Sequence, residues 1–462
     1  MTTIETAFAP AEDRSFFGHP RGLAYLAFTE AWERFSFYGM SGLLLLYLIQ
    51  RLLTPEVMGG VLGLGAFRSV VEAVTGPLSN QAFASQIYGL YGGLVYFTPM
   101  FGGLLADRLL GQRRTVMLGA LLMSGGHILM AFDASFLIAA FLLVTGSGCL
   151  KGNISAQVGH LYPKEDESRR TRAFAIFSAS INFGALTGPL VCAVVAQIWG
   201  WHAGFGVASV LMLAALATYV AGRRYLPPDR KRGDGPKHPP LTARDYRIVA
   251  GLILVSALAV FPSIAYYQES NAGILMIEES VSRGLFGWTV PTSAFNALDG
   301  FFCIVLVPPL VRLWRGQARR GREPGDMSKI AIGFLVTAVA NLAIMIPAGW
   351  IDADPAVKVS MLWPVALFGL NALGFLYYWP TLLALFSRAA PAAVNATLMG
   401  VLFFSLFFAN VLIGTFGGWW EEMSHTRFFA FHAALAIVPC AIAILLARPF
   451  GRLFAPVPGR TQ

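Results

Sequence analysis

Long apolar segments recur along almost the whole chain, and their length limits the folds that it can adopt. A helix that crosses a bilayer needs about 20 mostly apolar residues, and the sequence provides twelve such runs. Hydrophobic residues make up 56% of the chain and charged residues only 13%, against about 25% charged residues in soluble proteins. The chain is therefore predicted to be an all-α integral membrane protein, and the disordered, disulfide-rich and nucleic-acid-binding classes are excluded. We expect spans at 22–52, 84–106, 115–133, 135–160, 173–198, 203–222, 247–272, 291–313, 329–349, 361–386, 393–418 and 428–447.

The distribution of positive charge predicts the orientation in the membrane. Cytoplasmic loops carry an excess of lysine and arginine. If both termini are cytoplasmic, 27 of the 34 lysines and arginines lie on the inner side and five on the outer side. This asymmetry favours an even number of spans with both ends inside. It also accounts for the net charge of +9 without a nucleic-acid partner.

One hydrophilic stretch divides the chain into two equal sets of spans. Residues 223–246 are rich in proline, glycine and charge, which is typical of a flexible linker. We therefore expect an N-terminal six-helix bundle at 1–222, a cytoplasmic linker at 223–246, a C-terminal six-helix bundle at 247–450 and a cytoplasmic tail at 451–462. Two six-helix halves are the plan of major-facilitator transporters, in which the substrate binds near the midplane and the halves rock around it.

Ionisable residues inside spans are costly, so they indicate function. Glu30, Glu33 and Arg34 fall on one face of the first span. Two acids against one base leave a carboxylate that can bind and release protons; the alternative is an ion-pair cluster that fixes helix packing. Lys151 lies among small residues in the middle of the fourth span. Its ammonium requires an anion, either a carboxylate of the first span, Glu269 or the substrate, unless it extends to the interface.

The second half carries two further acids in or near its spans. Glu269 lies towards the outer end of the seventh span, where it either binds protons, pairs with Lys151 or lies at the headgroup level. Asp299 lies in the eighth span and faces either a wet cavity or a helix that donates a hydrogen bond to it. Asn182 and Asn296 must hydrogen-bond to another helix or to a substrate.

Several motifs resemble one family of transporters. The segment Glu30-Ala-Trp-Glu33-Arg34-Phe-Ser-Phe-Tyr38-Gly is similar to the first-helix ExxER signature of proton-dependent oligopeptide transporters. Residues 177–186 (FSASINFGAL) resemble the FYxxINxGSL signature of the same family. Residues 103–108 (GLLADR) resemble the major-facilitator loop between the second and third helices. The matches cover the N-terminal half closely and the C-terminal half more loosely.

The resemblance implies a role for individual residues. Those implied to couple transport to protons are Glu30, Glu33, Arg34, Lys151 and Glu269. Those implied to line the substrate site are Tyr38, Tyr96, Lys151, Asn182 and Asn296. We add Phe375, which stands at the position of the family's tenth-helix acid, and Asp299, which is not a feature of the family. Asp107 and Arg108 are implied to hold a cytoplasmic gate.

The chain also departs from the family pattern where that family binds the two ends of a peptide. Ser41 stands where a basic residue is usual, and Phe375 stands at the position of an acid on the tenth helix. The seventh-helix tryptophan position is Ala265. The proton-coupling residues are thus complete, whereas the residues that recognise peptide ends are not. Asp299 is a candidate for the missing negative charge.

We predict a proton-coupled symporter that imports di- and tripeptides or peptide-like substrates by alternating access. The alternatives are a proton-coupled carrier of a non-peptide metabolite and a proton-driven multidrug exporter. Because the sequence lacks a metal cluster, a nucleophile elbow and a phosphate-binding loop, we expect neither an enzyme nor a cofactor or metal, with protons as the coupling ion. We expect a monomer in the bacterial inner (plasma) membrane, with no nucleic-acid partner.

Overall fold

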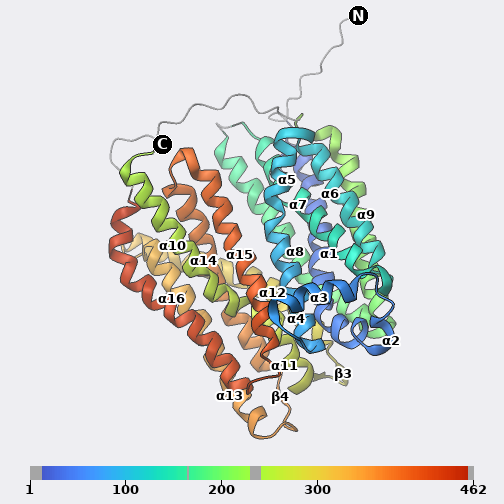
Figure 1. Cartoon of the computed structure of the whole chain (residues 1–462). Coiled ribbons are helices and arrows are strands. Elements are labelled where there is room, and N and C mark those ends of the chain that lie inside the picture. The colour runs from blue at the N-terminus through green and yellow to red at the C-terminus, as the bar shows by residue number, and fades with distance from the viewer. Residues whose placement is uncertain (1–12, 164–165, 229–240, 456–462) are drawn as a thin grey trace, which may run out of the picture. The chain divides into compact units, whose positions relative to one another are not determined.

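A computed structural model describes residues 13–163, 166–228 and 241–455. Within these ranges, eleven helical segments are long and apolar enough to cross a membrane (Figure 1). The remaining predicted span, 115–133, falls in α6 (Gln112–Leu129), where Arg113, Arg114 and His127 lower the mean hydropathy. The count of twelve spans therefore stays a prediction. Half of the predicted linker, residues 229–240, lies outside the described residues, as does the end of the predicted tail, 456–462.

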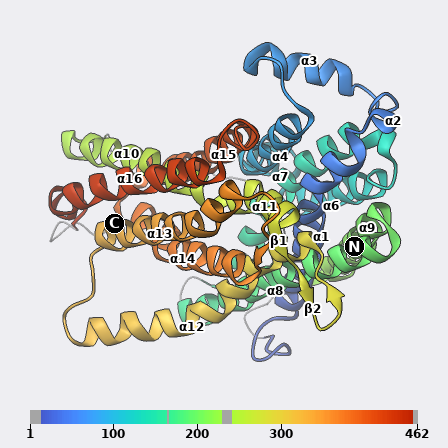
Figure 2. The same cartoon turned by 90° about the horizontal axis from the view of Figure 1, so that it is seen from below.

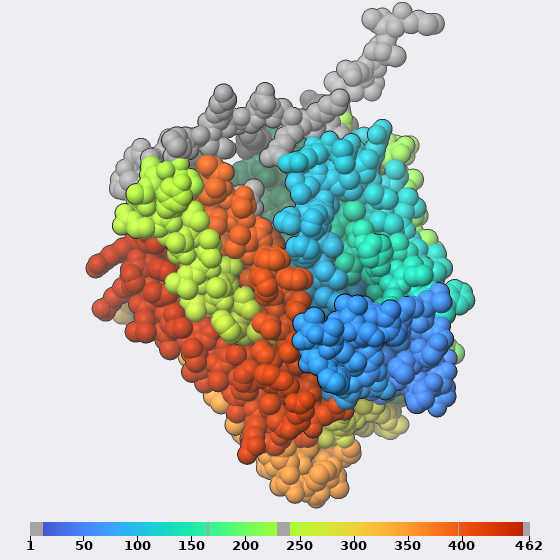
Figure 3. All heavy atoms as spheres, in the orientation of Figure 1, coloured from blue at the N-terminus to red at the C-terminus, as the bar shows by residue number. Residues whose placement is uncertain are grey.

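The first part of the chain forms long helices with one excursion. Its helices are α1 (Arg21–Tyr47), the π-helix η1 (Leu48–Leu52), α2 (Pro55–Met58), α3 (Leu64–Thr75), α4 (Asn80–Phe97), α5 (Pro99–Leu105), the π-helix η2 (Ala106–Leu110), α6, the 3-10 helix η3 (Asp133–Ser135), α7 (Phe136–His160), α8 (Glu167–Trp199), α9 (Trp201–Gly222) and the 3-10 helix η4 (Arg223–Tyr225). The α2–α3 excursion lies at the surface in the face that Figure 3 shows, with Val70 and Val74 exposed.

The second part contains more long helices and four short strands. Its helices are α10 (Ala243–Tyr267), the 3-10 helix η5 (Gln268–Ser270), α11 (Ala272–Ser280), η6 (Thr292–Asn296), α12 (Ala297–Arg319), α13 (Asp326–Ala353), α14 (Leu362–Ala389), η7 (Ala392–Val394), α15 (Asn395–Gly418) and α16 (His425–Leu453). Strand β1 (Val281–Ser282) pairs in parallel with β4 (Val359–Ser360), and β2 (Gly284–Leu285) pairs antiparallel with β3 (Trp288–Thr289) (Figure 2).

The chain divides into two compact units, which are treated separately. The N-terminal unit comprises the described residues of 1–43, 60–62 and 97–235, and the C-terminal unit comprises those of 44–59, 63–96 and 236–462. The outer part of the first span and most of α4 thus belong to the C-terminal unit. Tyr96 therefore lies in the same unit as Glu269, although it belongs to the first half of the sequence.

Glycines allow the helices of the N-terminal unit to pack backbone to backbone. A Cβ atom on Gly188 of α8 would lie 2.4 Å from the Phe35 carbonyl of α1, and one on Gly184 would lie 2.6 Å from the Phe35 nitrogen. A Cβ atom on Gly102 of α5 would lie 2.1 Å from the Gly148 carbonyl of α7. No side chain fits at such distances, so small residues set these helix contacts. The seam between α1 and α8 fixes the helix face that carries Glu30, Glu33 and Arg34.

Aromatic and aliphatic side chains fill the core of the C-terminal unit. Helix α13 packs against α14 and α16, and α10 packs against α15. Phe334, Tyr378 and Phe386 are fully buried in this core. Gly333 of α13 and Gly374 of α14 are in close contact, which brings these two helices together. Helix α14 therefore has a fixed position, and it carries Asn371 and Phe375.

Candidate functional site

Glu30, Glu33 and Arg34 form one buried ionic cluster on α1. All three are at most 3% exposed. Arg34 donates from Nη2 to Glu33 Oε1 at 2.9 Å, and its Nε atom lies 2.5 Å from Glu33 Oε2 and 3.1 Å from Glu30 Oε1. The Nε contacts are within ion-pair distance but lack hydrogen-bond geometry. The cluster forms because positions three and four apart share a helix face.

The two carboxylates of this cluster are not equally satisfied. Arg34 contacts Glu33 through two nitrogens but Glu30 through one. The Oε2 atoms of both glutamates are buried and accept no hydrogen bond from the described residues, but only Glu33 Oε2 has an ion-pair contact, with Arg34 Nε. A buried carboxylate oxygen without a donor carries a desolvation cost that a bound proton removes. Glu30 is therefore the carboxylate of the cluster best placed to be protonated.

Lys151 of α7 joins this cluster through the ring of Phe37. Its Nζ atom lies 4.9 Å from the ring centroid, and the Arg34 Cζ atom lies 5.3 Å from the same centroid. The electrostatic field of Lys151 acts on Glu30 and Glu33. Two cations thus lie near two acids inside the N-terminal unit. The structure places Lys151, which is half-buried, at the same phenylalanine ring as Arg34, which agrees with a first-span carboxylate as its anion among those the sequence allowed.

The other predicted residues of the N-terminal unit are Tyr38, Asn182, Asp107 and Arg108. Tyr38 is half-buried beside Phe37, with ring centroids 5.2 Å apart. Asn182 is half-buried on α8. Asp107 and Arg108 are exposed on the π-helix η2, which is a surface position compatible with a gate. Their roles stay predictions.

The two predicted site acids of the C-terminal unit, Glu269 and Asp299, contact hydrogen-bond donors rather than cations. Asn371 of α14 donates from Nδ2 to Glu269 Oε2 at 2.9 Å, and both side chains are at most 3% exposed. Tyr266 donates from its hydroxyl to Asp299 Oδ1 at 2.6 Å. Within the described part of the chain neither carboxylate makes an ion pair. These acids differ from the N-terminal cluster because their negative charge has no internal counter-ion.

Phe375 belongs to a stack of three aromatic rings beside Asp299. Its ring lies 4.7 Å from the ring of Tyr266 at an interplanar angle of 15°, and 6.0 Å from the ring of Trp379 at 16°. The sequence indicates Phe375 as a site residue but neither Tyr266 nor Trp379. The one local pattern that could have indicated Trp379 is its position one helical turn after Phe375. Likewise, the pairing of Asn371 with Glu269 joins residues 102 positions apart, which no local pattern indicates.

The remaining predicted residues of the C-terminal unit are Tyr96 and Asn296. The Tyr96 and Tyr267 hydroxyls are 3.1 Å apart. Asn296, at the end of η6, donates to the Ser293 carbonyl at 3.2 Å. This bond stays within its own helical element, and the expected bond to another helix or to a substrate stays a prediction.

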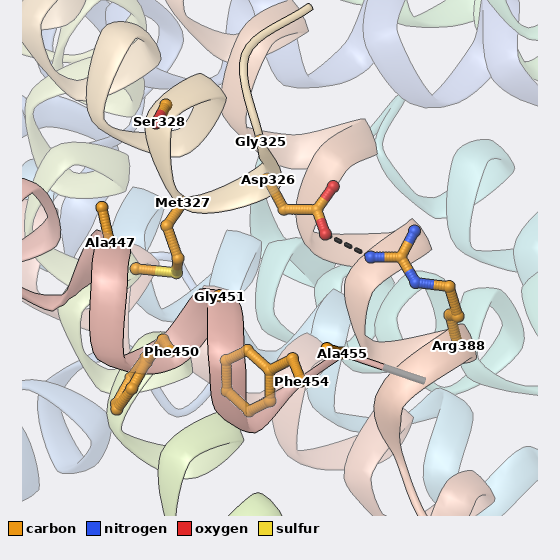
Figure 4. A pocket seen from close by; sticks show the side chains of 10 residues that line it. All are labelled: Gly325, Asp326, Met327, Ser328, Arg388, Ala447, Phe450, Gly451, Phe454 and Ala455. Carbon is orange, nitrogen blue, oxygen red and sulfur yellow. Dashed lines mark hydrogen bonds and ion pairs between the residues drawn. The ribbon is translucent and has the colours of Figure 1, made fainter. Parts of the chain in front are cut away.

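A surface hollow occurs elsewhere in the C-terminal unit, at the ends of α13, α14 and α16 (Figure 4). An ion pair between Asp326 and Arg388 lies on one side of it, and Met327, Phe450 and Phe454 form its apolar wall. None of the predicted site residues lines this hollow, so it carries no part of the candidate site. Among the described residues, no group of three or more His, Cys, Asp or Glu side chains could hold a metal ion.

Buried charges inside apolar helices define the class of protein. A multi-pass helical membrane protein that keeps ionised side chains in its spans is typical of ion and solute transporters. Comparisons with known proteins agree with this class. The chain is similar to a crystal structure of the peptide transporter POT in complex with sulfate, with a TM-score of 0.82, 27% identity and coverage of 97% of this chain and 99% of that one.

Sequence comparisons give the family. The POT family model matches residues 113–236 and 241–427. The chain is 30% identical to the di-/tripeptide transporter of Lactococcus lactis subsp. lactis (strain IL1403), over 96% of this chain and 98% of that protein. It is also 30% identical to the uncharacterized transporter YclF of Bacillus subtilis (strain 168), over 96% of both chains. The chain belongs to the POT family and is a multi-pass membrane transporter with the major-facilitator fold.

Proposed function

We propose that the protein is a proton-coupled symporter that imports di- and tripeptides or peptide-like substrates by alternating access. The observation that carries the proposal is the buried cluster of Glu30, Glu33, Arg34 and Lys151, in which one carboxylate oxygen of Glu30 lacks a donor. The relative from Lactococcus lactis is described as a di-/tripeptide transporter, which supports peptides as the cargo. Bacterial relatives favour the inner (plasma) membrane, and we propose a monomer as the working unit.

The cluster can couple a proton to a conformational change by simple electrostatics. While Glu30 is ionised, it shares the charge of Arg34 with Glu33, and Lys151 lies nearby. Protonation of Glu30 removes one negative charge and leaves an excess of positive charge around Lys151, which then favours an anionic partner such as a substrate carboxylate. Each proton that moves inward yields about 2.3 kcal/mol per 100 mV, which drives uptake against a gradient. Glu269 is a second proposed proton site, because no cation neutralises it.

The proposal predicts that Glu30→Gln uncouples transport. In liposomes with an imposed inward proton gradient, the natural protein is expected to accumulate labelled dialanine. The variant keeps the size and hydrogen-bonding capacity of residue 30 but cannot cycle a proton. It is therefore expected to lose gradient-driven accumulation by about tenfold or more, while it still exchanges labelled for unlabelled peptide across the membrane.

Glu422→Gln is a matched control, because it makes the same change of a carboxylate to an amide. Glu422 is exposed and lies near the outer end of α15. Its accumulation should equal that of the natural protein. Uptake by the natural protein that ignores the proton gradient would remove the coupling from the proposal. A complete failure to exchange any di- or tripeptide would remove the peptide cargo.

A second cargo class is motivated by a specific observation. The aromatic stack that contains Phe375 occupies a position where the resemblance expects an acid. Ser41, at the position where a base is usual, has a buried hydroxyl without a hydrogen-bond partner in the described chain. A non-peptide metabolite is therefore the alternative cargo. A screen for thermal stabilisation separates the two, because under this alternative a non-peptide acid stabilises the protein and no peptide does.

A further inference from the structure

Asp299 lies on the inward face of α12. Phe301, Ile304 and Val305 are among the exposed apolar residues of this helix. At 100° per residue, Asp299 lies at least about 120° away from each of them. It contacts Tyr266 of α10 instead. Its carboxylate is therefore directed into the C-terminal unit.

Only one of the two oxygens of Asp299 is occupied. The Tyr266 hydroxyl and the Cys303 thiol both approach Oδ1, at 2.6 Å and 4.0 Å. No described residue donates to Oδ2, and the side chain is half-buried rather than fully enclosed. The tyrosine thus holds the carboxylate in one orientation and leaves its second oxygen available to a ligand.

The middle stretches of α10, α12, α13 and α14 provide no cation for that oxygen. The sequence has neither lysine nor arginine at 248–282, 284–311, 330–357 or 359–387. The nearest acid, Glu269, adds further negative charge and has Asn371 as its donor. An ionised carboxylate in such surroundings is stabilised most by a cation that arrives from outside the unit.

The aromatic stack shapes what can accompany that cation. The Phe375 ring lies nearly parallel to the rings of Tyr266 and Trp379. Stacking of this kind engages ring faces and leaves ring edges for a ligand. Phe375 and Trp379 are half-buried, so their edges form an apolar wall next to Tyr266 and Asp299. Such a wall favours an apolar group beside the cation.

We infer that Asp299 binds a primary ammonium group of the substrate and that the edges of Phe375 and Trp379 contact an apolar or aromatic side chain next to it. The substrate class is thus zwitterions with a free amino group and an apolar neighbour, such as peptides with an N-terminal phenylalanine. This inference rests on the proposed function for its cargo, but it concerns only the C-terminal unit.

Binding to the purified full-length protein tests the inference without any transport step. The probes are Phe-Ala, N-acetyl-Phe-Ala and Gly-Ala, with affinity measured by titration. Because a hydrogen bond to a charged group is lost, acetylation is expected to weaken binding to the natural protein about tenfold or more. Asp299→Asn should remove this discrimination, with the two phenylalanine peptides then binding within about twofold of each other. Phe375→Ala should reduce the preference for Phe-Ala over Gly-Ala while keeping the preference for a free amine.

Two further variants serve as controls for this binding test. Glu323→Gln, in the exposed loop before α13, should retain full discrimination. Tyr266→Phe leaves the carboxylate in place but removes the hydroxyl that orients it, and it should reduce the discrimination severalfold even if Asp299→Asn does not fold. Equal binding of the free and acetylated peptides to the natural protein would overturn the inference, as would full discrimination by Asp299→Asn.

Benzylamine, an amine without a peptide bond, separates this inference from the proposed function. If benzylamine binds in an Asp299-dependent manner and no peptide binds, the ammonium site stands and the peptide cargo falls. If peptides bind equally well with and without a free amino group, the cargo stands and the ammonium site falls.

Discussion

The two units place charge in their spans in opposite ways. In the N-terminal unit, Glu30 and Glu33 are paired with Arg34, and Lys151 lies at the same phenylalanine ring. In the C-terminal unit, Glu269 and Asp299 are held by an amide and a phenol, without a cation. The first arrangement neutralises itself. The second needs a proton or a positively charged ligand, because a buried carboxylate without a counter-ion is costly. The difference lies in the counter-ions: the acids of the N-terminal unit have cations within the same unit, whereas Glu269 and Asp299 depend on a proton or on a cation from outside.

The largest loss of stability should come from removing Arg34, the cation that pairs with both acids of α1. Arg34→Met keeps the length of the side chain but leaves two buried acids with only Lys151 nearby. Removing one partner of a buried ion pair costs about 3–5 kcal/mol. Thermal unfolding in detergent should show a large fall in stability.

A second substitution tests the cause of that fall. In the double variant Arg34→Met with Glu33→Gln, one stranded charge is gone, and part of the lost stability should return. An unchanged melting temperature in Arg34→Met would mean that the charges of this cluster are solvated, and the contrast between the units would disappear.

The same measurement on the C-terminal unit should give a much smaller effect. Glu269→Gln removes a buried negative charge but keeps an oxygen that can accept from Asn371. We expect stability within about 1 kcal/mol of the natural protein, or above it, because no ion pair is lost. Gradient-driven uptake should nevertheless decrease, since residue 269 can no longer cycle a proton. A destabilisation as large as that of Arg34→Met would reveal a cationic partner of Glu269.

The smallest expected change in stability concerns His19, a hydrogen-bonded histidine of the N-terminal unit that lies outside the spans. His19 is buried just before α1, with Nδ1 2.8 Å from the Tyr162 hydroxyl. Burial lowers the pKa of His19, and the nearby charges of Arg169 and Arg172 lower it further. The unfolded chain therefore binds a proton more readily than the folded one. The stability from neutral His19 is fully present above its ordinary pKa of about 6.5 and is lost as pH falls towards the lower pKa of the folded state.

His19→Gln should flatten this dependence. Between pH 7.5 and pH 5, the natural protein should lose more thermal stability than the variant, by about 2 °C or less. His425→Gln is a suitable control, because that histidine lies at the start of α16 in the other unit and its partner is Asp352. Identical pH profiles for the natural protein and His19→Gln would show that the histidine does not titrate with folding.

The parts of the site that the sequence predicts are those that helix geometry determines. Glu30, Glu33 and Arg34 meet because their spacing of three and four residues places them on one side of a helix. For Lys151 the sequence indicates only that a buried ammonium requires an anion, and it leaves a first-span carboxylate, Glu269 and the substrate open. A local rule therefore predicts the three charges on α1 but not the position of Lys151 beside them.

The parts that could not be predicted depend on the register between distant helices. Tyr266, Phe375 and Trp379 stack only because α10 and α14 lie at one particular height relative to each other. The same register brings Asn371 to Glu269. The grouping of Tyr96 with the C-terminal unit also escaped prediction, since the linker at 223–246 divides the sequence but does not determine where each segment packs.

The glycine seam between α1 and α8 has a consequence for motion. Gly184 and Gly188 are in direct contact with the α1 backbone, so at these positions no layer of side chains separates the two helices. Such close packing hinders sliding of one helix past the other. We expect α1 and α8 to move together as one rigid body. The acids on α1 would then shift together with Asn182 on α8 in any conformational change, and a bulky substitution at Gly184 or Gly188 would uncouple the two helices.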